Sequence, residues 1–593
     1  MVGPQYDLLA NPLGAVRLTF ERAMAAGIAA GPYSASDGKD WGAVPLFQDF
    51  LFDHSRLSQV PILNHETVKW IGANTLVRYR GMVQDMLGNE FYVGAHKVGS
   101  VWKTNKFSDH SQFPMDSSCE SRVWERRLLY CVPVPGLNSW AEPTWDGLQA
   151  HRPVDFTSPQ RDKRPRMDIE EEASGDGSSE HSPSLKKMRE DGHPSTSSQC
   201  QDSMTVESCH QPTMLADTER DSLPCLVKIY DSPESDLQLN NVFEFIGVLT
   251  FDSDIPADKN ARDDFSSSLC DEELVRLPPS KVPRLHCIIH RKLELPDFLC
   301  RSPVIEPNHH FVKHIREALL KHLTTIFGND GVVAHFVLLH LLSKVHARLD
   351  NMAVGKFSLN LTGLSKESVS VFGSQLSIAL KNLLPLTNFI PLTVGYLNRA
   401  SLAPKKDYQL NRLIPGVLQL AEGSHLIIDE TQLEAGTLNS VGVENASLLK
   451  DLMEFQKVKY DFQYYSMEMA ADIKLLILSE GKSNILPADI IVPFQPSSVS
   501  SLEVVDAESL DAWRWYLANV RSLEHTIQPE MQKVVENDLV AARQTDRTLG
   551  SQEFSRWLTM ARLISASFGE TSLSLEHWQM AKELERLRKE RLG

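Results

Sequence analysis

The chain has 593 residues, which is too long for one hydrophobic core, so we expect about two to four domains. Its hydrophobic content of 42% and charged content of 23% are ordinary for a soluble globular protein, and a formal net charge of −17 argues against a protein that coats nucleic acid with its whole surface. No apolar run approaches the roughly 18 residues of a bilayer-spanning helix, and the first residues lack the pattern of a secretory signal. The sequence therefore predicts a soluble intracellular protein.

Residues 1–60 are predicted to form a helical N-terminal segment. The stretches 61–150 and 223–295 alternate apolar and polar residues over short runs, which is typical of β-strands. A Gly-Asn pair in "TLVRYRGMVQDMLGNEFYVGAHKV" predicts a turn, and "PCLVKIYD" and "LQLNNVFEFIGVLTFD" are predicted to be strands joined by a turn. Because strands lie on both sides of a polar segment, and closure entropy grows slowly with loop length, we expect one β-barrel with a long insertion.

The insertion, residues 151–222, is predicted to be a disordered linker. It is rich in serine, proline and charge, and such a segment buries too little apolar area to offset the entropy lost on ordering. Two basic clusters separated by an acidic stretch fit a bipartite nuclear-import signal, although basic clusters are also common in linkers. Their residues are Lys163, Arg164 and Arg166, then Lys186, Lys187 and Arg189. Ser158 and Ser182 precede prolines beside these clusters and are candidate phosphorylation sites, where phosphate would neutralise nearby basic charge.

The hydrophobic period changes near residue 300. Helical spacing comes first, with a break at Gly328, and continuous apolar strands then alternate with helices as far as residue 500. This pattern is typical of a parallel α/β layer buried on both faces. Residues 505–593 are predicted to form a separate helical domain. The predicted fold class is therefore multidomain, with α+β and α/β parts.

One apolar strand, "GSHLIIDET", ends on the carboxylates of Asp429 and Glu430. In a phosphate-handling ATPase, such a pair would hold magnesium through water and polarise the attacking water. A short apolar run followed by two acidic residues is also expected about once by chance in a chain of this composition. The strand alone therefore does not establish an ATP site.

A working site also needs a glycine-rich loop whose amides surround the phosphates, with a lysine to meet their charge. The candidate is "GLSKESVS" after the strand "FSLNLT". Gly363 and Ser370 align with the loop pattern, but Ser368 replaces the second glycine and Val369 replaces the lysine. Because these two changes remove most of the phosphate-binding energy, we predict no catalytic residues, no cofactor and no enzymatic activity.

No metal site is predicted either. The eight cysteines include no CxxC pair, so neither a zinc ribbon nor a disulfide framework is indicated. His310, His314 and Glu317 share one helical face, but three such residues on an exposed helix are common and no fourth ligand is evident nearby.

Several stretches resemble subunits of the MCM replicative helicases. "LTTIFGNDGVVAHFVLLHLLSKV" is similar to the helical lead-in to their ATPase core, and "VKYDFQYYSMEMAADIKLLILSEGKS" to their hairpin and strand before the sensor position, here near Ser479. The C-terminal helices resemble the helical lid, with Arg562 near the lid arginine, and "LVRYRGMVQDM" and "LNNVFEFIGVL" resemble strands of the N-terminal OB barrel. The resemblance implies a split OB-like β-barrel with a disordered insertion, a degenerate AAA+-like α/β core and a C-terminal helical lid.

The closer resemblance is to the MCM-binding protein family, which comprises divergent relatives of MCM subunits. It is carried by "NPLGAVRLTF", "RGMVQDMLGNEFYVG", "LLYCVPVPG", "KDYQLNRLIPGVLQL", "LIIDETQLEAG" and "SEGKSNILPADI". The resemblance implies a non-catalytic nuclear protein that binds MCM helicase subunits and acts in DNA replication. The implied roles are MCM assembly or stability, the unloading of MCM complexes from chromatin in late S phase, and support of sister chromatid cohesion.

Two other functions stay open. One is a weak ATPase with a remodelled phosphate loop, and the other is a single-stranded nucleic-acid-binding barrel whose aromatic residues stack on bases. The aromatic residues in question are Tyr79, Phe91, Tyr92 and Trp102. Because barrel aromatics more often lie in the core, we expect no direct nucleic-acid binding, an indirect association with chromatin and no membrane partner.

Overall fold

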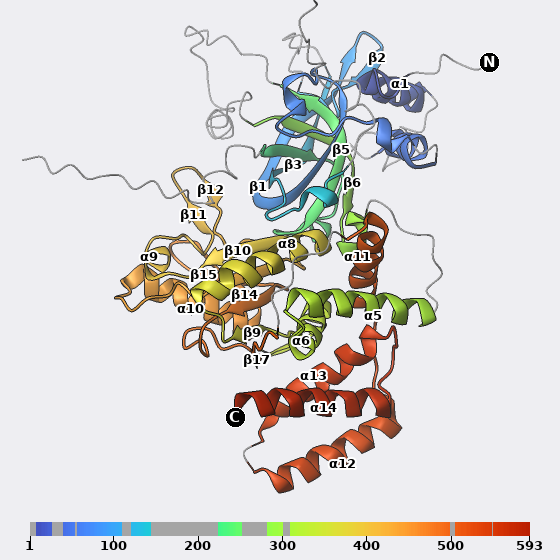
Figure 1. Ribbon diagram of the computed structural model, residues 1–593. Helices are drawn as coiled ribbons and strands as arrows, with labels where there is room; N and C mark the ends of the chain where they lie inside the picture. Colours follow the sequence, from blue (N-terminus) through green and yellow to red (C-terminus); the bar gives the residue numbers. More distant parts are fainter. Residues whose placement is uncertain are drawn as a thin grey trace, which may run out of the picture. The chain divides into compact units, whose positions relative to one another are not determined.

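The computed structural model describes residues 7–25, 40–53, 56–109, 120–143, 223–251, 282–299, 309–350, 352–497, 505–547 and 549–593. All of them belong to one compact unit, Met1–Asp146 with Ser222–Gly593. The predicted linker 151–222 lies outside the described residues, and so do its import-signal residues, Ser158 and Ser182. The described residues form helices and several sheets, so the mixed class that the sequence predicts is confirmed (Figure 1).

The N-terminal segment contains helices that pack on the first sheet. The elements are α1 (Pro12–Ala25), α2 (Ala43–Gln48) with the π-helical turn η3 (Asp49–Asp53), and the 3-10 turns η4 (Leu57–Gln59) and η5 (Thr67–Lys69). Asn11 begins α1 by accepting a hydrogen bond from the Gly14 amide. Val16 of α1 and Phe47 of α2 are buried in one cluster with Val248 from the sheet. The burial of this apolar face therefore fixes the helices on the sheet.

The first sheet closes on itself. Its strands are β1 (Leu76–Val98), β2 (Val101–Thr104), β3 (Ser121–Val132), β4 (Cys225–Ile229), β5 (Val242–Thr250) and β6 (Arg284–Lys292). The strand order is β2-β1-β3-β4-β6-β5, and β1 also pairs with β5, from Leu76 opposite Val248 to Met82 opposite Val242. A ring of five strands results, with Phe245 and Leu285 among the fully buried residues of its core. Strands from both sides of the predicted linker therefore make one sheet.

One local prediction in this sheet is wrong. The Gly-Asn pair is not a turn, because β1 continues through it and pairs with β3 on both sides, from Met82 to His96. Gly88 has a positive φ of 95° and lies at a shift in register, so it forms a bulge that bends the long strand. The predicted strands β4 and β5 are present, and the segment between them contains the 3-10 turn η8 (Glu234–Asp236), but they are not neighbours because β6 lies between them in the sheet.

The second sheet is the buried layer of an α/β core. Its strands are β9 (Leu359–Thr362), β10 (Thr387–Pro391), β13 (His425–Asp429), β16 (Lys474–Leu478) and β17 (Ile490–Pro493). Their order is β10-β13-β16-β9-β17, and every neighbouring pair is parallel. All residues of β13 and β16 are buried, because helices cover both faces of the sheet. This two-sided burial explains why residues 426–428 of β13 and 475–478 of β16 form continuous apolar runs.

Helices and short connections surround this sheet. They are α5 (His309–Ile326), α6 (Gly331–Leu342), α7 (Lys366–Ser368), the π-helical η10 (Val369–Gly373), α8 (Ser374–Leu383), α9 (Val394–Leu397) and α10 (Ser440–Phe455). The predicted break at Gly328 is confirmed, since Gly328 and Asn329 both have positive φ between α5 and α6. Asp330 then caps α6 by accepting a hydrogen bond from the Val333 amide.

Two small sheets extend from the core. The first contains β11 (Lys405–Asp407), β12 (Arg412–Ile414), β14 (Lys457–Asp461) and β15 (Ser466–Ala470) in the order β12-β11-β14-β15. The second is the hairpin of β7 (Ala347–Leu349) and β8 (Met352–Val354). In Figure 1 the hairpin of β11 and β12 stands out from the α/β core.

The C-terminal part is helical, as predicted. Its helices are α11 (Ala507–Arg521), α12 (Pro529–Thr545), α13 (Ser551–Ser567) and α14 (Leu575–Leu592). The Tyr516 hydroxyl of α11 donates a hydrogen bond to the Ser567 carbonyl of α13 over 2.6 Å, and Trp578 of α14 donates from its ring nitrogen to Asp538 of α12 over 2.8 Å. Across the described ranges, no helix is both long and apolar enough to cross a membrane.

The barrel and the α/β core are joined by hydrogen bonds. The Gln84 side-chain amide of β1 donates to the Leu413 carbonyl over 2.7 Å, and the Leu413 amide donates to Asp85 over 2.7 Å. At a second contact the Thr387 amide donates to the Gly136 carbonyl, and Gly136 has a positive φ of 72°. A Cβ atom at Gly136 would lie 2.5 Å from the Thr387 carbonyl oxygen, so this close approach requires glycine.

A pair of histidines is buried where α6 meets the sheet. His340 and His425 contact each other through their Nε2 atoms at 3.0 Å, and the Nδ1 atom of His340 donates to the Phe357 carbonyl. Burial lowers the pKa of His340 to about 4 and holds the pKa of His425 well below its usual range. Both rings are therefore neutral in the folded protein at neutral pH.

Replacing a buried barrel phenylalanine should destabilise the protein strongly. Phe245 is fully buried in the barrel core, whereas Phe91 of the same barrel is 72% exposed. We expect Phe245→Ala to lower the free energy of unfolding by about 3 to 5 kcal/mol and Phe91→Ala to change it by less than about 0.5 kcal/mol. Urea denaturation followed by circular dichroism measures both. Equal effects of the two substitutions would contradict the placement of these side chains.

The histidine pair should make stability sensitive to acid. Because the unfolded chain binds protons at these rings below about pH 6.5 and the folded chain does not, stability is complete above that pH and falls as the pH drops toward 4. We expect His340→Gln to reduce this loss between pH 7 and pH 5, on the order of 1 to 2 kcal/mol. Denaturation midpoints across that range measure it, with the exposed His314→Gln as control. If the free energy of unfolding of His340→Gln falls with pH as steeply as that of the wild type, the histidine pair does not control acid stability.

Candidate functional site

The predicted site residues of the α/β core meet at the carboxyl edge of the parallel sheet. Asp429 is the last residue of β13, Ser479 follows β16, and Gly363 follows β9. These three strands are neighbours, with Asp429 opposite Leu478 and Leu478 opposite Leu361. This is the edge at which open α/β sheets bind their ligands. The structure therefore brings the loop at Gly363, the acidic pair and the region of Ser479 together.

The first amides of the loop after β9 are already hydrogen-bonded. The Gly363 amide donates to the Glu480 carbonyl over 2.8 Å, and the Leu364 amide donates to the Ser479 carbonyl over 3.1 Å. A phosphate-binding loop needs amides that point at the anion without a protein acceptor. The loop after β9 instead uses these amides to close the edge of the sheet.

The side chains of this loop also form hydrogen bonds and an ion pair within the protein. Ser365 caps α7 by accepting a hydrogen bond from the Ser368 amide, and the Ser370 hydroxyl donates to the Glu367 carbonyl over 2.6 Å. The ammonium of Lys366 forms an exposed ion pair with Glu434 at 2.8 Å. The Ser370 hydroxyl and the Lys366 ammonium are thus engaged in local contacts that stabilise the helix start and its surface.

The two carboxylates of the site have different surroundings. Asp429 is buried, and its Oδ1 atom accepts hydrogen bonds from the Thr431 amide at 3.0 Å and the Thr431 hydroxyl at 2.6 Å, so it stabilises the turn after β13. Burial raises the pKa of Glu430, and its Oε2 atom has no hydrogen-bond partner among the described residues. Of the two carboxylates, Asp429 therefore stabilises the backbone turn after β13.

Ser479, the residue that follows β16, also stabilises the sheet. The Ser479 hydroxyl donates to the side-chain oxygen of Asn360 in β9 over 2.7 Å, and both residues are buried. Sequence analysis did not identify Asn360, because nothing in its local pattern distinguishes it from other strand residues. Only the neighbouring position of β9 and β16 reveals this contact.

Arg562 of α13 is not joined to the acidic pair. No ion pair of the described chain connects it to Asp429 or Glu430, and burial lowers its pKa. The pKa of His525 is lowered to about 4, mainly by burial and to a smaller extent by the positive charge of the Arg562 guanidinium. The structure therefore brings Gly363, Asp429 and Glu430 to one edge of the sheet, whereas Ser370 contacts the Glu367 carbonyl and no ion pair between described residues joins Arg562 to the acidic pair.

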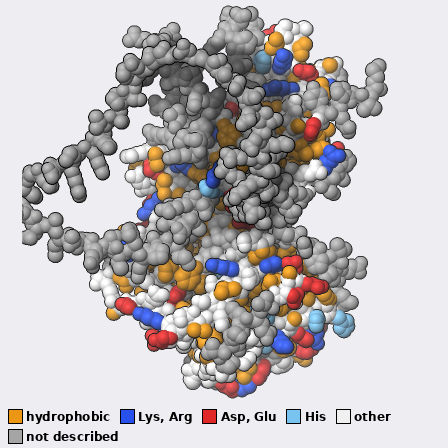
Figure 2. Space-filling view, turned by 45° about the horizontal axis from the view of Figure 1, so that its top comes forward, with side chains coloured by type: hydrophobic (Ala, Val, Ile, Leu, Met, Phe, Trp, Pro, Cys, Tyr) orange, Lys and Arg blue, Asp and Glu red, His pale blue; other side chains and the backbone are white. Residues whose placement is uncertain are grey.

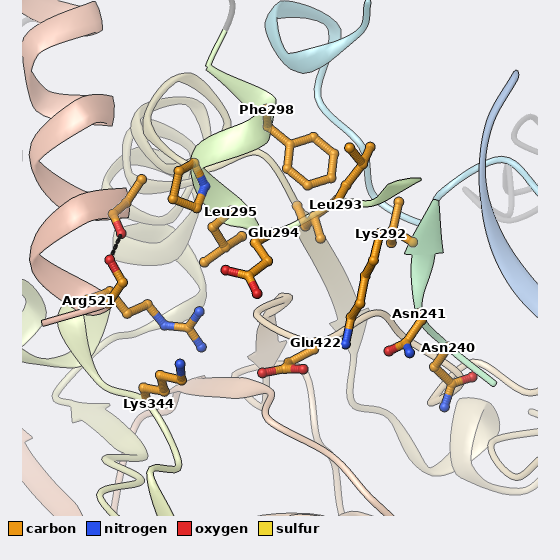
Figure 3. A pocket seen from close by; sticks show the side chains of 15 residues that line it. Asn240, Asn241, Lys292, Leu293, Glu294, Leu295, Phe298, Lys344, Glu422 and Arg521 are labelled. Carbon is orange, nitrogen blue, oxygen red and sulfur yellow. Dashed lines mark hydrogen bonds between the residues drawn. The ribbon is translucent and has the colours of Figure 1, made fainter. Parts of the chain in front are cut away.

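One cavity lies at the opposite, amino edge of the sheet, where it meets the end of β6 (Figure 3). It has a volume of about 100 Å³ and includes Leu386, before β10, and Glu422, before β13. In Figure 3 the carboxylates of Glu294 and Glu422 lie between Lys292 on one side and Lys344 and Arg521 on the other. Sites for drug-sized ligands have volumes of roughly 300 to 1,000 Å³, so this cavity is too small for a nucleotide.

A larger cavity of about 880 Å³ lies among the helices α5, α6, α13 and α14. Its lining is mostly apolar, and its two arginines are engaged. Arg316 donates to the Ser567 hydroxyl over 2.9 Å, and Arg591 forms an ion pair with Asp330 at 2.7 Å. An apolar space with engaged arginines does not suit a triphosphate.

The barrel aromatics do not form one exposed platform. Tyr79 is buried in the barrel core, Tyr92 packs against Tyr230 and Trp124, and the ring of Trp102 is covered by the Arg122 guanidinium. Phe91 alone of the four is highly exposed. On the face in Figure 2, acidic and basic side chains are interspersed among apolar ones where the described residues are coloured.

Metal ligands are not grouped in the described ranges. Among these residues no three or more His, Cys, Asp or Glu side chains are arranged to hold a metal ion. Within the same ranges Cys131, Cys225 and Cys287 are buried thiols outside any disulfide.

Comparison with known proteins identifies the family. A family model described as mini-chromosome maintenance replisome factor matches residues 47–592, which is nearly the whole chain. The chain belongs to this family. The match includes the barrel strands on both sides of the linker, the α/β core and the C-terminal helices, whereas α1 and most of α2 lie before its first residue.

Full-length relatives of this family member carry one name, mini-chromosome maintenance complex-binding protein. The chain is 59% identical to the relative from Arabidopsis thaliana, with complete coverage of both chains. It is 34% identical to the relative from Gallus gallus, over 93% of this chain and 94% of the relative, and 31% identical to the relative from Homo sapiens, over 99% and 98%. This name describes those proteins by what they bind and not by a reaction.

We expect this family member to bind no ATP, because the first amides of its phosphate loop are bonded within the protein and the loop lysine is replaced. Isothermal titration calorimetry with ATP and magnesium should give no saturable signal for the wild type or for Asp429→Ala. Asp429→Ala should instead lower the free energy of unfolding, by about 1 to 3 kcal/mol, since it leaves the Thr431 donors unpaired. Magnesium-dependent ATP binding that is lost in Asp429→Ala would mean that the loop at Gly363 opens to hold phosphate.

Proposed function

We propose that this chain is a non-catalytic partner of MCM complexes in DNA replication. It acts in the nucleus as an assembly and stability factor for MCM complexes, takes part in their unloading from chromatin in late S phase, and thereby supports sister chromatid cohesion. The observation that carries the proposal is the full-length similarity to relatives named for binding the mini-chromosome maintenance complex. The hydrogen-bonded loop at Gly363 supports the non-catalytic part.

We infer that the chain imitates an MCM subunit in shape. Numbered along the chain, the five core strands have the order 2-3-4-1-5, which fits an AAA+-like core, and the closed ring of barrel strands and the C-terminal helices fit an OB-like barrel and a helical lid. MCM subunits share each ATP site across an interface, one subunit giving the phosphate loop and the other an arginine. A subunit of this shape with a closed loop at Gly363 docks on a neighbour without completing an ATP site.

Such a partner would act on the ring and not on nucleotide. Docked on a free subunit, it covers a surface that otherwise aggregates or pairs wrongly, which accounts for a role in assembly and stability. Docked at an interface of a finished ring, it competes with the neighbouring subunit, which accounts for unloading. Both outcomes follow from the same surface and differ only in which MCM species is present.

Capture of MCM subunits should be independent of the acidic pair in this chain. The matched variant is Asp429→Asn, which keeps the shape of the side chain and its oxygen acceptor for Thr431 but removes the charge that would hold magnesium. We expect the full-length wild type and Asp429→Asn to retain a purified MCM complex equally in a pull-down assay. A wild type that retains no MCM subunits would disprove the proposed function, and a loss confined to Asp429→Asn would show that nucleotide chemistry takes part.

A further inference from the structure

The tips of two neighbouring hairpins form an exposed aromatic surface on the α/β core. One hairpin joins β11 to β12 and the other joins β14 to β15. We call the following residues the hairpin cluster: Tyr408, Leu410, Phe462, Tyr464, Tyr465 and Met467.

Direct contacts hold the two tips together. The Tyr408 hydroxyl donates a hydrogen bond to the Phe462 carbonyl over 3.0 Å, and the rings of Tyr408 and Tyr464 have centroids 5.5 Å apart. Phe462 and Tyr465 stack with centroids 5.0 Å apart and an interplanar angle of 6°. The aromatic rings are therefore held in one arrangement by these contacts and do not depend on a partner for their order.

The hairpin cluster is unusually exposed for its chemistry. Tyr464 is 82% exposed and Tyr465 57%, and Tyr408, Leu410 and Met467 are also exposed. A soluble protein rarely leaves adjacent large apolar side chains in water without a function, and such patches commonly mark interaction sites. Tyrosine and methionine are among the residues enriched at protein–protein interfaces.

The small sheet that carries the cluster also has an open edge. β12 is covered by the barrel, through the hydrogen bonds of Gln84 and Asp85 to Leu413. β15 is the opposite edge strand, and in the part of the chain that the structure describes no strand pairs with its outer side. Exposed edge strands accept an extended peptide as an additional strand, because their outer backbone groups have no protein partner.

The charge of this sheet favours an acidic partner. Residues 405–414 and 457–470 contain five basic and three acidic side chains, a net charge of +5 − 3 = +2, in a chain whose net charge is −17. Lys405 and Lys459 are exposed, and none of the ion pairs between described residues includes them. The two lysines lie in β11 and β14, the central strands of the sheet. A local positive area on an acidic protein attracts and orients negatively charged partners.

A protein segment fits this surface better than a single-stranded nucleic acid. Leu410 and Met467 have no ring on which a base stacks, and a nucleic-acid track needs several lysines or arginines for successive phosphates. Here Lys457 is paired with Glu468, Lys406 donates to the Asn411 carbonyl, and Arg412 lies over the ring of Tyr130.

We propose that the hairpin cluster and the outer edge of β15 bind an extended acidic segment of an MCM subunit. This inference rests on the proposed function and adds to it the place of contact. The segment pairs with β15, its apolar side chains cover the tyrosine rings, and its carboxylates face Lys405 and Lys459. The tyrosines supply the affinity, and the lysines supply orientation and a dependence on salt.

The test compares full-length variants in their capture of a purified MCM complex. We expect Tyr464→Ala combined with Tyr465→Ala to weaken binding at least about tenfold. Lys459→Glu should weaken binding as well and should flatten its dependence on salt. Phe91→Ala, which removes a similarly exposed aromatic ring from the barrel, serves as matched control and should bind as the wild type does.

Three outcomes separate the possible failures. If the wild type captures no MCM complex, the proposed function fails and this inference fails with it. If the wild type captures MCM and the tyrosine double variant captures it equally well, the contact lies elsewhere and only this inference is overturned. If the double variant keeps MCM capture but loses binding of fluorescent oligothymidylate, the hairpin cluster is a nucleic-acid site and the inference is overturned. Thermal unfolding of each variant excludes a general loss of structure, since the replaced side chains are exposed.

Discussion

Two backbone hydrogen bonds tie the loop after β9 to the loop after β16, and the chemistry open to the α/β core depends on them. The Gly363 and Leu364 amides donate to the carbonyls of Glu480 and Ser479, so each has a strong acceptor inside the protein. A phosphate ion at this edge would have to displace both bonds and leave two carbonyls without donors, at about 1 to 3 kcal/mol for each unpaired group. No lysine occupies the place where it would offset that loss. The edge at which open α/β sheets bind their ligands is a closed structural edge here.

A closed edge changes what the sheet contributes to function. Its central strands β13, β16 and β9 are buried throughout and give a rigid support, with Ser479 and Asn360 joined across β16 and β9. Surfaces around the support are then available for contacts with other proteins. The hairpins of β11–β12 and β14–β15 are the clearest example, because the barrel holds one end of their sheet at Leu413 while the other end is open. A closed sheet edge and hairpin surfaces that are open to solvent fit the proposed role of a docking partner.

The sequence predicts the strands and helices well wherever burial is continuous. Residues 426–428 of β13 and 475–478 of β16 are continuously apolar, and the break at Gly328 is visible as Gly-Asn-Asp, so the alternation of strands and helices follows from pattern alone. The bulge at Gly88 does not follow from the sequence pattern. There the pairing of β1 with β3, from Met82 to His96, overrides the local turn signal of Gly-Asn. The position of β6 between β4 and β5 depends on contacts distant in sequence. At the candidate site, the missing glycine and lysine predict weak phosphate binding. The hydrogen bond from the Gly363 amide to the Glu480 carbonyl could not be predicted, because it depends on the folded backbone.

The measurement that tests the central claim most directly is cross-linking of the full-length protein to a purified MCM complex, with the linked lysines located by mass spectrometry. Docking through the α/β core predicts that links to MCM subunits concentrate on exposed lysines of residues 309–497, among them Lys366, Lys405 and Lys459. Links confined to barrel lysines such as Lys103 and Lys292, with none on the core, would contradict docking through a subunit-like α/β core and would assign MCM binding to the barrel.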